Sequence, residues 1–98
     1  MTIQSTRNEN VLTVMPEGRL DTLSSPELAE FLKKNYDSIS GLILDLSNIS
    51  YASSAGLRVL LMAEKAMKDK GGVTIRNANK LVMGVLSVTG LLDILHVE

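Results

Sequence analysis

The segment Tyr51-Ala52-Ser53-Ser54-Ala55-Gly56-Leu57-Arg58 separates a strongly apolar run from a helical pattern, and these two patterns indicate the fold. The run before it, residues 41–46, is nearly continuous in apolar residues, which is typical of a central strand covered on both faces. After it, apolar residues recur at helical spacing from about residue 55 to residue 70. Because sites gather where parallel strands end and helices begin, this segment is the first place to look for function.

The rest of the chain alternates between the same two patterns. The predicted order is β-β-α-β-α-β-α-β, with Ser25 capping the first helix and Pro26 as its first residue. Alternating strands and helices predict an α/β fold with a mixed, mainly parallel sheet packed against helices that lie mostly on one face. One domain over residues 1–98 is expected at this length. We expect strands at 2–6, 11–15, 41–46, 73–75 and 94–97, and helices at 25–36, 55–70 and 80–89.

Composition removes several classes of function. The 98 residues contain no cysteine and one histidine, which excludes disulfide frameworks, thiolate metal sites and a cysteine nucleophile. A net charge of -1 argues against nucleic acid as a direct partner, because such proteins usually carry a basic patch. No apolar run approaches the ~20 residues that span a bilayer, and the first ten residues are too polar for a targeting segment. We therefore expect a cytoplasmic protein without a membrane span.

The sequence offers no catalytic or cofactor-binding constellation. His96 is the single histidine, and no G-x-S-x-G turn presents a serine to it. Neither a phosphate-binding G-x-x-x-x-G-K-[ST] loop nor a dinucleotide-binding G-x-G-x-x-G motif is present. The acidic residues Asp21, Asp45 and Asp93 are too scattered for a metal box. We therefore expect a protein that is not an enzyme and holds no cofactor or metal.

The two serines of the central segment admit two interpretations. A serine at a helix start can cap the helix, which contributes about 1 kcal/mol. The same position favours negative charge, so a phosphate there would be tolerated by the helix. From the residues alone, capping by Ser53 or Ser54 and phosphorylation of one of them both remain open.

Four segments in order resemble the STAS family, the bacterial anti-sigma factor antagonists. The central segment is similar to that family's signature, an aromatic residue, a variable residue and Asp-Ser-[Ser/Thr]-Gly-Leu before a helix. The other three resemble its Gly-x-[Leu/Ile]-Asp loop, the strand and turn before the signature, and a late helix end. They are Gly18-Arg19-Leu20-Asp21, Leu44-Asp45-Leu46-Ser47-Asn48-Ile49 and Val88-Thr89-Gly90-Leu91.

The resemblance implies a partner-switching regulator. Its phosphorylated serine, two residues before the signature glycine, corresponds to Ser54, with Ser53 as the runner-up. Asp21 corresponds to an acidic residue near the phosphosite. The implied partners are an anti-sigma factor serine kinase, bound when the serine is unmodified and released on phosphorylation, and a phosphoserine phosphatase. Residues expected to bind the partner or lie near the phosphosite are Asp21, Ala55, Gly56, Leu57 and Arg58.

Two departures from the signature keep an alternative open. Ser53 stands where the family has aspartate, and Ala55 replaces the second hydroxyl residue. The acceptor hydroxyl remains, but a charge that shapes kinase or phosphatase recognition is gone. The alternative function is a scaffold or regulatory subunit of a signalling or transport complex that uses the same fold without phosphorylation.

Overall fold

One long strand organises the sheet in the computed structural model, which describes all 98 residues. Strand β2 (Val11–Leu20) pairs antiparallel with β1 (Thr2–Asn8) through residues 11–17. On its other side the first half pairs with β3 (Gly41–Asp45) and the second half with β4 (Ile49–Ala52), both in parallel. A single strand therefore connects the centre of the sheet to the site at its end.

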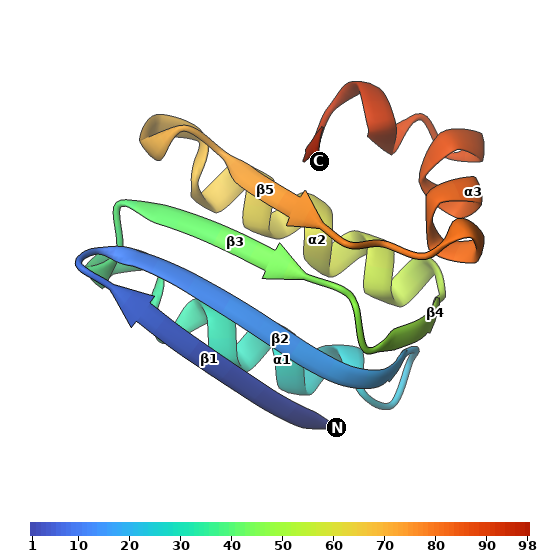
Figure 1. Cartoon of the computed structure of the whole chain (residues 1–98), viewed down its shortest axis with the longest axis horizontal. Helices are drawn as coiled ribbons and strands as arrows, with labels where there is room; N and C mark the ends of the chain where they lie inside the picture. Colours follow the sequence, from blue (N-terminus) through green and yellow to red (C-terminus); the bar gives the residue numbers. More distant parts are fainter.

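The remaining strands extend the sheet beyond β3. The order is β1-β2-β3-β5-β6, where β5 spans Val73–Arg76 and β6 spans His96–Val97, and both pairings are parallel (Figure 1). Only β1 runs antiparallel to its neighbour. The predicted fold class, an α/β domain with a mixed and mainly parallel sheet, is confirmed.

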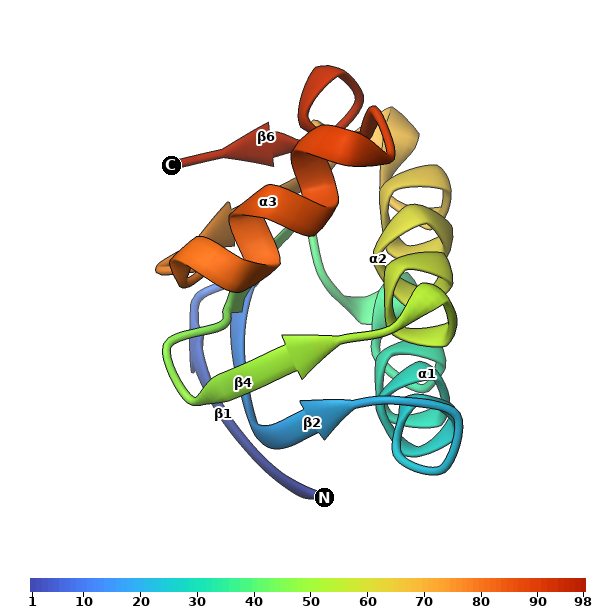
Figure 2. The ribbon, with the colours of Figure 1, turned by 90° about the vertical axis from the view of Figure 1, so that its right-hand side faces the viewer.

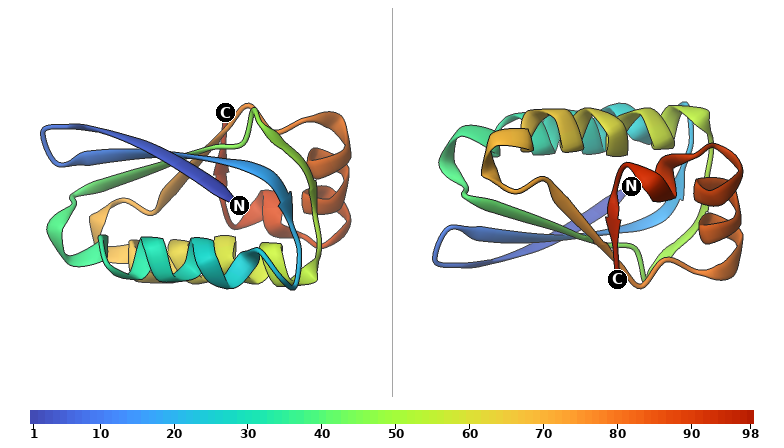
Figure 3. Two further views of the ribbon diagram at one scale, coloured as in Figure 1. Left: turned by 90° about the horizontal axis from the view of Figure 1, so that it is seen from below. Right: turned by 90° about the horizontal axis from the view of Figure 1, so that it is seen from above.

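Two of the three helices cover the same face of the sheet, and the third lies elsewhere. Helices α1 (Ser25–Lys33) and α2 (Ser54–Ala66) pack side by side on one face (Figure 3). Helix α3 (Lys80–Val88) crosses the end of the molecule beside β4 (Figure 2). Short 3-10 turns follow the helices at Tyr36–Ser38 (η1), Lys68–Lys70 (η2) and Leu91–Asp93 (η3).

The core lies between the sheet and the helices, and this corrects one expectation about β3. Strand β3 is central, as predicted, but only Leu42 and Leu44 are buried while Ile43 between them is half-exposed. The apolar run was therefore misread as a strand covered on both faces. Successive side chains of a strand point to opposite faces, so only the helix-covered side of β3 is sealed from water.

The sequence did not predict β4, and it predicted β2 too short. Residues 16–20 and 49–52 were assigned to no helix or strand, yet residues 18–20 pair in parallel with β4, with a register shift between Gly18 and Arg19. Gly18 has a φ of +111°, a conformation that L side chains rarely adopt and glycine adopts freely. The observed order therefore contains one strand more than expected, placed directly before the serine segment.

The start of α1 also differs from the prediction. Ser24, not Ser25, occupies the N-cap position, and Pro26 is the second residue of the helix and not the first. Ser25 is 2% exposed, and its hydroxyl has no hydrogen-bond partner. Ser25 precedes the buried Leu28 by three residues, so it lies on the buried stripe of the helix and faces the core.

Candidate functional site

The ends of β2 and β4 bring two distant loops together. Leu20 pairs with Ala52, and the backbone N–H of Ser53 donates a 2.7 Å hydrogen bond to the carbonyl oxygen of Leu20. Asp21, directly after β2, and Ser53, directly after β4, therefore leave the sheet side by side, and Ser54 follows as the first residue of α2. Figure 2 shows both loops at the same end of the molecule. This is the carboxyl edge of parallel strands, where the sequence placed the site.

Gly56 allows α2 to begin against the end of β2. A Cβ atom at Gly56 would lie 2.7 Å from the Leu20 Cβ and 2.9 Å from the Leu20 carbonyl oxygen, distances that real Cβ atoms avoid. The next residue, Leu57, is 7% exposed and belongs to the core. Both residues fix the position of the helix start. Their predicted contribution to partner binding stays a prediction, but neither presents an exposed side chain.

The two serines of the segment differ in accessibility. Ser54 is the first residue of α2 and is exposed. Ser53 is the N-cap, but its hydroxyl caps nothing: the Ser53 Oγ is buried and has no hydrogen-bond partner. Capping by either serine side chain, one of the two sequence interpretations, is therefore wrong. The hydroxyl that another protein can reach is that of Ser54.

The surface around Ser54 carries positive charge, and no acidic side chain lies in the same turn of the helix. The first turn of α2 contains no acidic residue. Arg58, one turn further on, is exposed, and its guanidinium makes no ion pair or hydrogen bond within the chain. Unpaired N–H groups at a helix start also favour an anion. A shallow depression of about 260 Å³ is lined by Ser54, Leu57, Arg58, Leu61, Thr89 and Leu91.

Asp21 lies beside this surface but directs its carboxylate to the other helix. Its Oδ1 accepts hydrogen bonds of 3.0 Å from the backbone N–H groups of Leu23 and Ser24, and its Oδ2 lies 3.8 Å from Arg19 Nε. The bond from the Ser24 backbone is the main cause that holds the pKa of Asp21 below its ordinary value. The structure therefore brings the backbone at Asp21 beside the Ser53 end of the serine segment, while the Asp21 carboxylate stabilises the start of α1.

Sequence reasoning missed two contacts that hold β4 in place. The Arg19 guanidinium lies 4.9 Å from the centroid of the Tyr51 ring, a cation–π contact between β2 and β4. Asn79 caps α3 by accepting from the Val82 N–H at 2.8 Å, and its amide donates to the Ile49 carbonyl oxygen at 3.1 Å. An asparagine directly before a helical pattern is a capping signal, so the cap was visible in the sequence, whereas the bond to Ile49 was not.

The structure also bears on metal binding and on the membrane. No group of three or more His, Cys, Asp or Glu side chains is arranged to hold a metal ion. None of the helices has the length and apolar character needed to cross a bilayer.

Comparison with known proteins finds relatives that are named anti-sigma-B factor antagonists. An anti-sigma-B factor antagonist of Bacillus subtilis (strain 168) is 31% identical over 93 residues, which is 94% of this chain and 85% of the relative. As the sequence predicted, this name is that of a regulatory protein and not of an enzyme.

Solved structures share the fold at lower identity. An anti-sigma factor antagonist from Mycobacterium paratuberculosis superposes with a TM-score of 0.89 at 22% identity, covering 98% of this chain and 83% of that one. The antagonist SpoIIAA in its unphosphorylated form gives a TM-score of 0.83 at 15% identity, covering 99% and 88%. The sequence profile described as "STAS domain" matches residues 2–98. The chain belongs to the STAS domain family.

Proposed function

We propose that this chain is a cytoplasmic anti-sigma factor antagonist, with residues 1–98 acting as one domain, and that Ser54 is its phosphorylation site. The observation that carries the proposal is the difference between the two serines. The Ser54 side chain is exposed beside the unpaired Arg58, whereas the Ser53 hydroxyl is buried. The name of the Bacillus subtilis relative supports the class of partner, an anti-sigma factor.

The unmodified surface favours docking. Ser54 and the half-buried Ala55 present small side chains without charge, so a partner loses little hydration energy when it covers them. Arg58 supplies one cation at the margin of this surface. In this state the chain holds the anti-sigma factor, and the sigma factor is free.

Phosphorylation reverses this preference. The anti-sigma factor acts as a serine kinase: the Ser54 Oγ attacks the terminal phosphorus of a nucleoside triphosphate, the hydroxyl proton leaves, and nucleoside diphosphate is released. The phosphoserine adds about -1.5 to -2 charges to a chain whose net charge is -1. A hydrated dianion in the contact costs desolvation energy and releases the partner. A phosphoserine phosphatase restores the hydroxyl by hydrolysis.

Two neighbouring charges tune the modified state. Arg58 lies four residues after Ser54, a spacing at which side chains on a helix meet, so its guanidinium can pair with the phosphate in the free protein. Asp21 is a carboxylate, with a pKa that its hydrogen bonds hold below the ordinary value, and its charge adds repulsion at the margin of the site. The proposal thus assigns Arg58 to the released state and Asp21 to the electrostatics of release.

The test is binding of serine variants to the anti-sigma factor encoded by the same genome. We expect Ser54→Asp to weaken binding by about a hundredfold or more, and Ser54→Ala and Ser53→Ala to bind like the unmodified chain. With the kinase and nucleoside triphosphate, the Ser53→Ala variant should still gain one phosphate by mass spectrometry and Ser54→Ala none. Equal binding of Ser54→Asp and the unmodified chain, or phosphate on Ser53, would contradict the proposal.

A scaffold that works without phosphorylation is the second candidate. It is favoured by Ser53, which stands where the family's signature has an aspartate. Mass spectrometry of protein isolated from cells with and without stress separates the two. Phosphate on Ser54 that changes with stress supports the switch, whereas an unmodified Ser54 in a stable complex under both conditions supports the scaffold.

A further inference from the structure

Helix α3 is apolar on both of its sides, although only one side packs against the protein. Val82 and Leu86 are fully buried, whereas Leu81 and Val88 are 55% and 89% exposed. After Lys80 the helix contains no charged residue. A helix that is apolar all round is normally buried all round, so the outer side of α3 lacks a covering surface.

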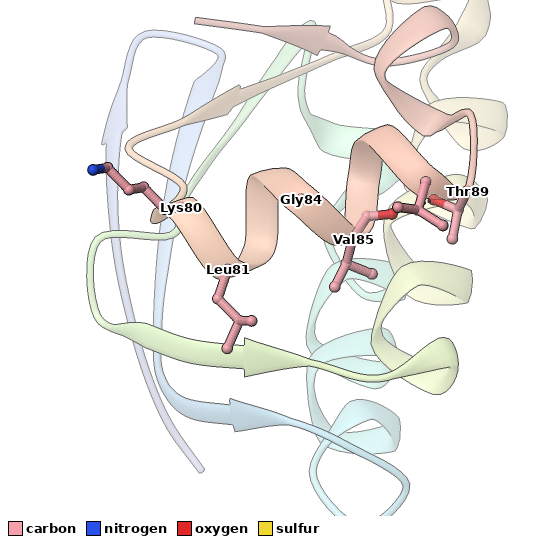
Figure 4. A pocket seen from close by; sticks show the side chains of 6 residues that line it. Lys80, Leu81, Gly84, Val85 and Thr89 are labelled. Atoms are coloured by element: carbon pink, nitrogen blue, oxygen red, sulfur yellow. Dashed lines mark hydrogen bonds between the residues drawn. The ribbon is translucent and has the colours of Figure 1, made fainter.

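Exposed apolar residues and the partly buried Val85 lie on one stripe of the helix. Leu81, Gly84, Val85 and Val88, here called the α3 stripe, follow the spacing i, i+3, i+4, i+7 of one helix face. Figure 4 shows Leu81 and Val85 projecting from the same side of the helix. They border a shallow hollow of about 360 Å³ that is completed by Lys80 and Thr89.

The α3 stripe adjoins the Ser54 surface. Thr89 lines both the hollow on α3 and the depression around Ser54. In Figure 2 helix α3, strand β4 and the start of α2 face the viewer together. A protein that docks on Ser54 is therefore in position to cover the stripe without crossing an edge of the molecule.

The stripe is too small to bind a protein by itself. Nine residues of helix are about 14 Å long and about 10 Å wide, so one face offers on the order of 150 Å². A stable interface needs about 800 Å² from each partner. The stripe must therefore be part of a larger contact, and the Ser54 surface is the neighbour that supplies the rest.

The charges at its margins indicate the chemistry of the partner. Lys80 at one end and Arg58 at the other make no ion pair within the chain. We propose that the α3 stripe is the second half of the surface that binds the anti-sigma factor, which covers it with apolar side chains flanked by carboxylates. This inference rests on the proposed function of Ser54.

The test uses neutral polar substitutions, so that no new charge confuses the result. Leu81→Gln and Val88→Gln, singly and together, are compared with Met62→Gln, which changes a 54% exposed side chain on the outer face of α2. Binding to the anti-sigma factor encoded by the same genome is measured by titration calorimetry. Circular dichroism and urea unfolding check that each variant folds.

We expect the double variant to bind at least tenfold more weakly, with Met62→Gln within twofold of the unmodified chain. Unchanged binding of the double variant overturns the inference, and if Ser54→Asp still abolishes binding, the proposed function stands alone. Lack of binding by the unmodified chain overturns both. A dimer of the unmodified chain in sedimentation that disappears in the double variant, with anti-sigma factor binding unchanged, assigns the stripe to a second copy and also overturns the inference.

Discussion

Two helices of this domain begin at a pair of serines that follows a strand, yet the two pairs behave in opposite ways. At α1 the pair is Ser24-Ser25, and Ser25, the first helical residue, is buried. At α2 the pair is Ser53-Ser54, and Ser54 in the same position is exposed. The N-cap serines differ as well, since Ser24 is hydrogen-bonded through its side chain and Ser53 is not.

The difference follows from which residues share the buried stripe of each helix. In α1 the buried Leu28 and Leu32 continue the stripe back to Ser25. In α2 the buried Leu60 continues it back to Gly56, four residues earlier, so Ser54 faces water. A serine pair before a helix can therefore place its second serine in the core or in solvent, and the positions of the apolar residues that follow decide which.

The helix starts also differ in whether an anion already occupies them. At the start of α1 the Asp21 carboxylate accepts hydrogen bonds from backbone N–H groups, and Glu27 is a second acidic residue in the first turn of the helix. The start of α2 has neither. A phosphate at Ser54 would therefore meet unopposed N–H groups, whereas one at α1 would meet two carboxylates.

The largest effect on stability is expected at Gly56, where α2 approaches the end of β2 most closely. Gly56→Ala places a Cβ against the Leu20 backbone, so we expect a loss of about 1–3 kcal/mol in the free energy of unfolding. Gly84→Ala is the matched control, because a Cβ there meets no atom within 4 Å and should stabilise the helix by about 0.5–1 kcal/mol. Urea unfolding measures both. Similar values for the two variants would contradict the packing role of Gly56.

A smaller effect separates the two N-cap serines, beginning with Ser24. Ser24→Ala removes the hydroxyl that accepts from the Asp21 N–H at 3.0 Å and donates to the Arg19 carbonyl oxygen. We expect a loss of about 1 kcal/mol in the free energy of unfolding. Thr22→Ala, an exposed hydroxyl in the same loop without a hydrogen bond, serves as the control and should change little. A Ser24→Ala variant as stable as Thr22→Ala would overturn the assignment.

The opposite sign is expected at Ser53. Its hydroxyl is buried without a partner, so Ser53→Ala should leave the stability unchanged or raise it by up to about 1 kcal/mol. Ser54→Ala removes an exposed hydroxyl and should stay within about 0.5 kcal/mol of the unmodified chain. Thermal or urea unfolding decides. A clear loss of stability in Ser53→Ala would mean that this hydroxyl caps α2 after all.

The smallest effect concerns pH and the carboxylate at the start of α1. The Ser24 backbone hydrogen bond, followed by the other bonds and the Arg19 charge, holds the pKa of Asp21 below 3.8 in the folded state. A lowered pKa stabilises the fold above the ordinary value, and this contribution disappears as the pH falls through the folded pKa.

Asp21→Asn is therefore less stable than the unmodified chain at neutral pH, and the gap in urea midpoint closes as the pH falls below 3.8. Asparagine keeps a neutral acceptor oxygen, so the gap reports the charge and not the shape of the side chain. A gap that stays constant from neutral pH to well below 3.8 would show that the charge of Asp21 contributes nothing.

Much of the fold was predictable because its signals are local. The spacing of Leu57, Leu60 and Leu61 indicates a helix wherever that segment lies, and Ser25-Pro26 marks a helix start within one residue. The alternation of strands and helices then requires parallel pairing, because a helix carries the chain back to the start of the sheet. The four matched segments supplied the family.

The tertiary structure alone decided the features that depend on partners distant in sequence. Ile49–Ala52 become a strand only through pairing with the second half of β2, because four residues gain too little from their own propensity.

The same holds for the side chains at the site. From the residues alone Ser53 and Ser54 both remain candidates, and only the family resemblance favours Ser54 and places Asp21 near it. The outer side of α3 has no assignment from the sequence. The exposure and the hydrogen bonds of these side chains are set by how α1, α2 and α3 pack on the sheet, since burial belongs to the assembled core and not to the residue.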